Sequence, residues 1–82
     1  MVTIHRAHGM RFTIYTTDHE PAHVHVIGDG ELKINLNGEG GLPELVWSIG
    51  MKPADRRRAM DVVKDNKQDF LARWREIHGD AA

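Results

Sequence analysis

The hydrophobic pattern of this chain changes its period once, near Gly50. Before that glycine, apolar and polar residues alternate one by one in short runs, which is typical of half-buried antiparallel strands. After it, apolar residues recur every three or four positions, which is typical of a helix with one buried face. The sequence therefore predicts an α+β fold, in which an antiparallel meander of four to five strands is covered by a long C-terminal helix or by two helices.

Five alternating runs precede Gly50: TIHRAH, RFTIYTT, HVHVI, ELKINLN and ELVWSI. The first two should join through a short turn at Gly9-Met10, and the third and fourth through Gly-Asp-Gly, the clearest hairpin signal in the chain. Between the second and third runs, Pro21 interrupts the alternation, because proline cannot donate to a strand ladder. The fifth run is either a strand or an irregular crossing segment.

The helical part should begin at Pro53, which suits a first helical position, and end before Gly79. Its polar segment DNKQD permits two interpretations. Asp65 with Gln68 has the form of a capping box that would start a second helix. The apolar stripe nevertheless keeps its phase through this segment, which favours one helix over residues 53–78, roughly 39 Å long at 1.5 Å per residue. Such a helix would overhang a small sheet, and the overhang would need a partner, most simply a second copy.

The length and composition indicate one soluble globular domain over residues 1–82, with the sheet in residues 1–50 and the helical part in 51–79. The absence of cysteine excludes a thiolate metal site and a cysteine nucleophile, and it fits a reducing compartment. No signal peptide and no apolar run of membrane-spanning length is present, so we expect a cytoplasmic protein that does not enter a membrane. The net charge of −1 argues against a broadly cationic nucleic-acid binder.

The segment DHEPAHVHV holds three of the six histidines and is the strongest candidate for a functional site. His23 and His25 project from the same strand face, about 7 Å apart at the backbone, and could converge on one metal ion. Asp18, His19 or Glu20 could supply a third ligand and complete an open site of catalytic type for a divalent transition metal such as zinc or manganese.

Two other interpretations of this segment stay open. His23 or His25 could act without a metal as an acid, base or anion contact near neutral pH. The pair could also be a structural or partner-contacting feature on the open face of a strand, because Val24 and Val26 supply the core contacts. His5 and His8 approach the site only if the first strand pairs nearby. The catalytic candidates, if a reaction occurs, are Asp18, His19 and His25.

The stretches TIHR, MRFTIYTTDHEPAHVHV, ELKINL and KPADRRRAMDVVKDNKQDFLARW resemble the small bacterial family known as domain of unknown function 4160. Its central pattern runs RF…Y…DH-x-P-P-HVHV, and the likeness covers nearly the whole chain. Ala22 departs from it, standing where the family usually has a second proline. Members are often encoded beside another small protein, so the resemblance implies a protein-binding or regulatory role similar to that of toxin–antitoxin pairs.

Three functions follow from these observations. The first is a small protein-binding or regulatory module that contacts a partner or a second copy through an apolar helix stripe anchored by Phe70, Trp74 and Ile77. The second is a metal-dependent hydrolase or nuclease centred on His23 and His25. The third is nucleic-acid binding through the basic helix from Arg56 to Arg75, which the interleaved acidic residues disfavour. The sequence favours the first and names neither a partner nor a substrate.

Overall fold

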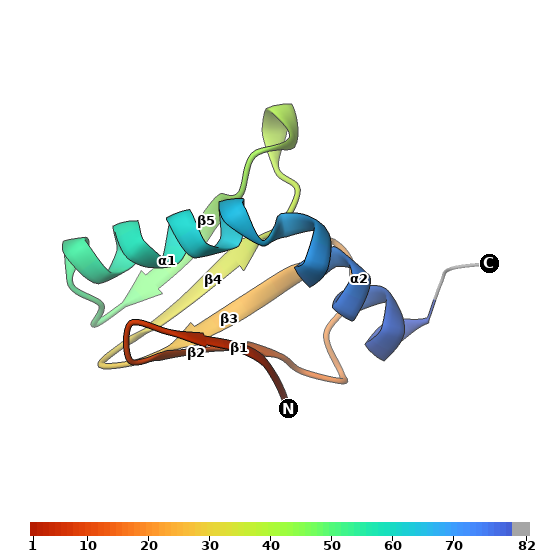
Figure 1. Ribbon diagram of the computed structural model, residues 1–82, viewed down its shortest axis with the longest axis horizontal. Helices are drawn as coiled ribbons and strands as arrows, with labels where there is room; N and C mark the ends of the chain where they lie inside the picture. The colour runs from red at the N-terminus through yellow and green to blue at the C-terminus, as the bar shows by residue number, and fades with distance from the viewer. Residues whose placement is uncertain (80–82) are drawn as a thin grey trace.

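The computed structural model describes residues 1–79 and has the α+β architecture that the change of period predicts. Five antiparallel strands follow one another in a meander, β1-β2-β3-β4-β5, and two helices come after them (Figure 1). The elements are β1 (Val2–Ala7), β2 (Met10–Ile14), β3 (His23–Ile27), β4 (Glu31–Asn35), the short 3-10 turn η1 (Glu39–Gly41), β5 (Glu44–Ile49), α1 (Pro53–Asp65) and α2 (Lys67–His78). The run ELVWSI is thus a strand and forms one edge of the sheet.

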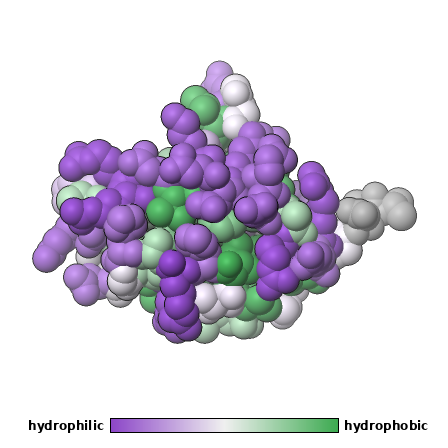
Figure 2. All heavy atoms as spheres, in the orientation of Figure 1, coloured by the Kyte–Doolittle hydropathy of each residue, from purple (hydrophilic) through white to green (hydrophobic). Residues whose placement is uncertain are grey.

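Both helices cover the same face of the sheet, and strand register decides which side chains meet them. Phe12 pairs with Val26, which pairs with Leu32. Residues directly opposite one another point to the same face, and so do alternate residues along each strand. They form the core with the helix stripe; the buried apolar residues are Met10, Phe12, Ile14, Val24, Val26, Leu32, Ile34, Leu36, Met51, Ala59, Val62, Val63, Phe70 and Trp74. Figure 2 shows mainly hydrophilic residues along the outer surface of the helices. The opposite face of the sheet, called here the helix-free face, carries the other alternate residues.

The β1–β2 turn lies one residue earlier than the sequence predicted. It consists of His8 and Gly9, with φ of 54° and 74°, and Met10 is already a buried residue of β2. Two successive positive φ values belong to the tight turn whose twist matches that of a hairpin. Placing Met10 in the turn was therefore wrong, because its side chain is needed in the core.

The single continuous helix favoured by the sequence is also wrong, because the helical part breaks at Asn66. Asn66 has φ −114° and ψ 16°, outside the helical region. Its backbone N–H and its side-chain Nδ2 both donate to the carbonyl oxygen of Val62, at 3.0 and 2.8 Å. The side-chain bond to this carbonyl competes with regular helix geometry. Beyond the break, α2 runs past the ends of the strands, beside the β2–β3 connection (Figure 1). The capping box of Asp65 and Gln68 does not form, since α2 has no side-chain cap.

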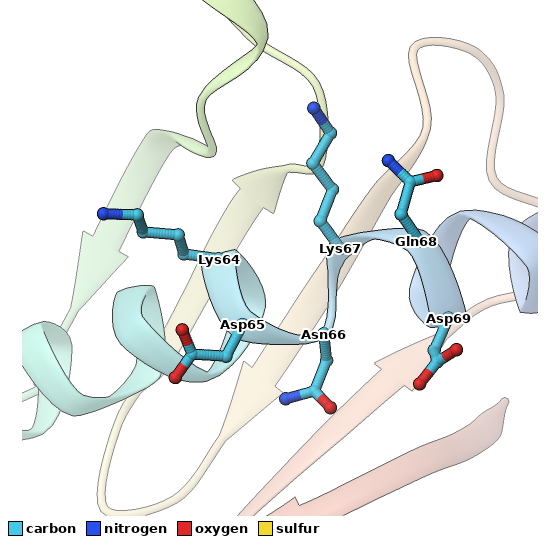
Figure 3. Close-up of a pocket in the computed structure, with 6 residues that line it drawn as sticks. All are labelled: Lys64, Asp65, Asn66, Lys67, Gln68 and Asp69. Carbon is cyan, nitrogen blue, oxygen red and sulfur yellow. The ribbon is translucent and has the colours of Figure 1, made fainter.

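The break leaves a shallow depression lined by Lys64, Asp65, Asn66, Lys67, Gln68 and Asp69 (Figure 3). Lys67 points away from Asn66 in this view, and its Nζ donates to the carbonyl oxygen of Gly41 in η1. The Lys67 hydrogen bond joins the projecting β4–β5 connection to the start of α2. The residues that line the depression therefore have a structural role. Among residues 1–79, no helix has the length and apolarity needed to span a membrane.

Candidate metal centre

The helix-free face carries a row of side chains that crosses four strands. Thr13 pairs with His25, His25 with Lys33, and Lys33 with Trp47. The rings of Tyr15 and Trp47 lie on either side of the His25 ring, with centroid distances of 4.5 and 5.8 Å. His25 is consequently only 9% exposed although no helix covers this face. The sequence prediction that the pair lies on an open strand face is therefore wrong about its exposure, whereas its structural or partner-contacting role stays a prediction.

Three side chains from the predicted segment converge at this row. Asp18, His23 and His25 each offer one ligand atom, and these three atoms lie within 4.8 Å of one another. The Nε2 atom of His23 is 3.2 Å from Oδ2 of Asp18, and that of His25 is 3.8 Å from Oδ1. Two ligands about 2.1 Å from a tetrahedral zinc ion would be roughly 3.4 Å apart. The two measured separations lie on either side of this value.

A tight turn between β2 and β3 holds the carboxylate of Asp18 in place. The backbone N–H of Asp18 donates to the carbonyl oxygen of Tyr15 at 3.0 Å, and the N–H of Tyr15 donates back to Oδ2 of Asp18 at 3.0 Å. An aspartate that bonds nearby backbone in this way stabilises a turn. The same hydrogen bonds fix the orientation of the Asp18 carboxylate at the candidate metal site.

The hydrogen bonds of His23 determine which of its nitrogens is free. Nδ1 lies 2.8 Å from the carbonyl oxygen of Pro21, which can only accept, so Nδ1 carries the proton. In the neutral ring, Nε2 then presents a lone pair to the carboxylate of Asp18. Facing lone pairs require a proton or a metal cation between them. A ligating histidine is usually oriented through its other nitrogen in this manner.

His25 is buried without a full set of hydrogen bonds. Its Nδ1 atom lies 3.4 Å from Oε2 of Glu31 but makes no hydrogen bond, and its Nε2 atom is 3.8 Å from Asp18. Burial lowers the pKa of His25 and outweighs the carboxylates of Asp18 and Glu31, which act in the opposite direction; a proton on His23 would lower it further. The ring is therefore neutral at pH 7, as a metal ligand must be.

The lowered pKa of His25 predicts that acid destabilises the metal-free protein. Between the ordinary histidine value of 6.5 and the lower folded value, the unfolded chain binds the proton more readily, so stability falls as pH falls through this window. Urea unfolding at pH 7.5 and 5.5 in EDTA should show a larger loss for the wild type than for His25→Asn. Equal losses in the two proteins would show that His25 does not cause the effect.

Not every residue of the predicted site joins the cluster. His19 is exposed and lies outside it, and the carboxylate of Glu20 instead accepts a hydrogen bond from Nε1 of Trp74 at 3.1 Å. His5 lies against Phe12 and Phe70 on the helix-covered face, with ring centroids 5.6 and 5.5 Å away. His8 is exposed in the β1–β2 turn. Only Asp18, His23 and His25 of the metal candidates are brought together.

The three predicted partner anchors lie in or beside the chain's own core. Phe70 and Trp74 are 2% and 3% exposed, and Ile77 is half-buried against the same cluster. The ring of Trp74 also lies 5.2 Å from that of His23, at the start of β3. Binding of a partner by these residues stays a prediction that a single chain does not test.

Several neighbours of the centre did not stand out in the sequence. Tyr15 and Trp47 flank His25, and Glu31 approaches its Nδ1 atom. The Gly-Asp-Gly hairpin contained a signal for Glu31, because a symmetric turn places Ile27 opposite Glu31 and His25 opposite Lys33. Tyr15 and Trp47 depend on pairings to β2 and β5 that local sequence does not specify.

Comparison with known proteins gives one match. No curated protein and no solved structure matches the chain. The family model described as domain of unknown function (DUF4160) matches residues 9–75, a range that contains Asp18, His23 and His25 as well as both helices up to Arg75. Since this match covers most of the chain, the protein belongs to the DUF4160 family.

Proposed function

We propose that this protein is a metal-dependent hydrolase whose divalent ion is bound by Asp18, His23 and His25. The observation that supports the proposal is the convergence of one carboxylate oxygen and two imidazole nitrogens within 4.8 Å. His23 has the second contact that is usual for a ligating histidine, through the Pro21 carbonyl, and the Glu31 carboxylate lies 3.4 Å from Nδ1 of His25.

The ligand set defines the chemistry of the proposed centre. Two histidine nitrogens and one carboxylate oxygen suit zinc, manganese or iron, and the lack of sulfur ligands disfavours copper(I). Three protein ligands leave at least one position for water or substrate, as in catalytic zinc sites. A divalent ion held by Asp18, His23 and His25 would lower the pKa of bound water and polarise a carbonyl or phosphoryl oxygen, which is the basis of hydrolysis.

Native mass spectrometry of tag-free protein, incubated with Zn²⁺ or Mn²⁺, tests the metal centre. The wild type should retain one ion per chain, and His23→Ala and His25→Ala should lose it. Glu31→Gln should weaken affinity by about 10- to 100-fold, the usual cost of an outer contact. His19→Ala is the matched control, because His19 belongs to the same motif but lies outside the cluster. Equal loss of metal in His19→Ala would contradict the proposed centre.

A second candidate function, binding a protein partner, is favoured by the exposed edge of the sheet. β5 pairs with β4 on one side only, and Leu45, Val46 and Ile49 are 39%, 45% and 66% exposed. An apolar edge strand with unpaired backbone groups can accept another strand. In this proposal the chain is one member of a toxin–antitoxin-like pair, and β5 binds its partner or a second copy.

The same mass spectra, recorded with the protein encoded by the adjacent gene, test the second candidate. A complex or a homodimer that Val46→Lys disrupts, while metal content is unchanged, would support partner binding through β5. A wild-type chain that remains monomeric and does not bind the protein encoded by the adjacent gene would contradict partner binding through β5.

A further inference from the structure

Three cationic side chains on the helix-free face lack a carboxylate partner. They are Arg6, Arg11 and Lys33. Arg6 and Arg11 lie directly opposite each other on β1 and β2, and Lys33 lies opposite His25. Within residues 1–79, none of the three has a carboxylate oxygen within 4.0 Å. Like charges placed directly across two strands destabilise a sheet, and an anion bound by both arginines would relieve this repulsion.

The arginine pair and the metal centre lie on one surface. Arg11 is two residues from Thr13 on β2, and Thr13 pairs with His25. Since alternate residues of a strand share a face and are about 7 Å apart, the arginines lie one row from His25, on the side away from His23. A long anion bound at the metal would therefore pass within reach of their side chains.

The charges of this face balance only when no metal is bound. Among the described residues, Arg6, Arg11 and Lys33 on this face are opposed by the carboxylates of Asp18, Glu31 and Glu44. A divalent ion at the centre would leave the face with a net charge of about +2. The chain's overall charge of −1 thus does not describe this surface, and anion binding here should depend on metal.

Aromatic rings complete the surface. Tyr15 and Trp47 are half-buried beside His25, so each residue remains partly accessible. Cationic side chains beside aromatic rings on a sheet bind single-stranded nucleic acid, because the cations contact phosphates and the rings stack on unpaired bases. A duplex keeps its bases stacked inside and would not use the rings.

We propose that the substrate of the metal centre is a single-stranded nucleic acid lying across the helix-free face. The inference rests on the proposed hydrolase function and adds its substrate class. Arg6, Arg11 and Lys33 bind phosphates, and Tyr15 and Trp47 stack on bases. In hydrolysis the oxygen of a water forms a bond to phosphorus, the phosphorus–oxygen bond to the leaving sugar breaks, and that sugar oxygen takes up the proton that the water releases.

Fluorescence anisotropy of a labelled twelve-nucleotide single strand tests this inference, with the protein either zinc-loaded or held in EDTA. Zinc-loaded wild type should bind at least about tenfold more tightly than the metal-free protein. Arg11→Gln should weaken binding by about tenfold and reduce the salt slope by about 0.7, the value for one phosphate contact on a single strand. Its metal content, checked by native mass spectrometry, should not change.

Arg57→Gln is the matched control, because Arg57 is an exposed arginine of α1 on the other layer of the molecule. Equal weakening by Arg11→Gln and Arg57→Gln would overturn the inference, since binding would then follow overall charge. Stoichiometric zinc without oligonucleotide binding, even if bis-p-nitrophenyl phosphate is hydrolysed, would overturn the nucleic-acid substrate alone. A wild type that binds no metal would overturn the hydrolase proposal and this inference together.

Discussion

Trp74→Ala should lower the free energy of unfolding by about 3–5 kcal/mol, the usual cost of removing a large buried aromatic side chain. Trp74 is 3% exposed in α2 and donates from Nε1 to the carboxylate of Glu20 at 3.1 Å. Its ring also contacts those of His23 and His78, with centroid distances of 5.2 and 3.9 Å. The substitution therefore removes core packing and loosens the β2–β3 loop, which carries Asp18.

Urea unfolding and zinc titration of the same variant would measure both effects. Trp47→Ala is a suitable control for the unfolding measurement, because Trp47 is half-buried on the helix-free face and its replacement should cost less stability. Trp74→Phe keeps a ring but loses the N–H donor, so it should fall between the wild type and Trp74→Ala. If Trp74→Ala were as stable as the wild type but failed to bind a partner, Trp74 would be the partner anchor that its sequence position suggested.

Gly30→Ala should destabilise the fold by about 3 kcal/mol or more, at the upper end of the cost of overpacking. A Cβ atom at Gly30 would overlap the carbonyl oxygen of Ile49 and the carbonyl carbon of Gly50, and it would lie 2.5 Å from the backbone nitrogen of Met51. All three are backbone atoms of the β5–α1 connection, so no side-chain rotation relieves the overlap. For a domain of this size, the melting temperature should fall by roughly 12 °C or more.

Differential scanning calorimetry against Gly40→Ala separates this overlap from ordinary backbone strain. Gly40 has a φ of 70°, but a Cβ atom added to it would meet nothing within 4 Å, so its replacement should cost only about 1–2 kcal/mol. Equal losses for the two variants would mean that the close approach at Gly30 does not constrain the fold.

The type and order of most strands and helices could be predicted from local sequence. Alternation in RFTIYTT, HVHVI and ELKINLN predicted three strands, and the three-residue spacing after Pro53 predicted the helical part. The errors occurred where one residue serves two requirements. Met10 satisfied a turn pattern but was required in the core. Asn66 fitted the helical phase, but its side chain also bonds the carbonyl of Val62 and its backbone leaves the helical region.

The candidate site was only partly predictable for a similar reason. Strand alternation placed His23 and His25 on one face, and Asp18 was a reasonable third ligand by proximity in sequence. The choice of Asp18 over His19 came from a turn that Tyr15 and Asp18 close with two hydrogen bonds. Such a turn fixes one side chain of the loop toward the strands and leaves its neighbour in solvent.

The sequence by itself determined the order of strands and helices, because hydrophobic period and turn residues act over a few neighbouring positions. It also determined that Val24 and Val26 enter the core opposite His23 and His25. Only the tertiary structure decided that the histidine side is buried, since this depends on Tyr15, Trp47 and Glu31 from other strands. Those contacts join residues distant in the chain, and cross-strand register, which local patterns do not encode, brings them together.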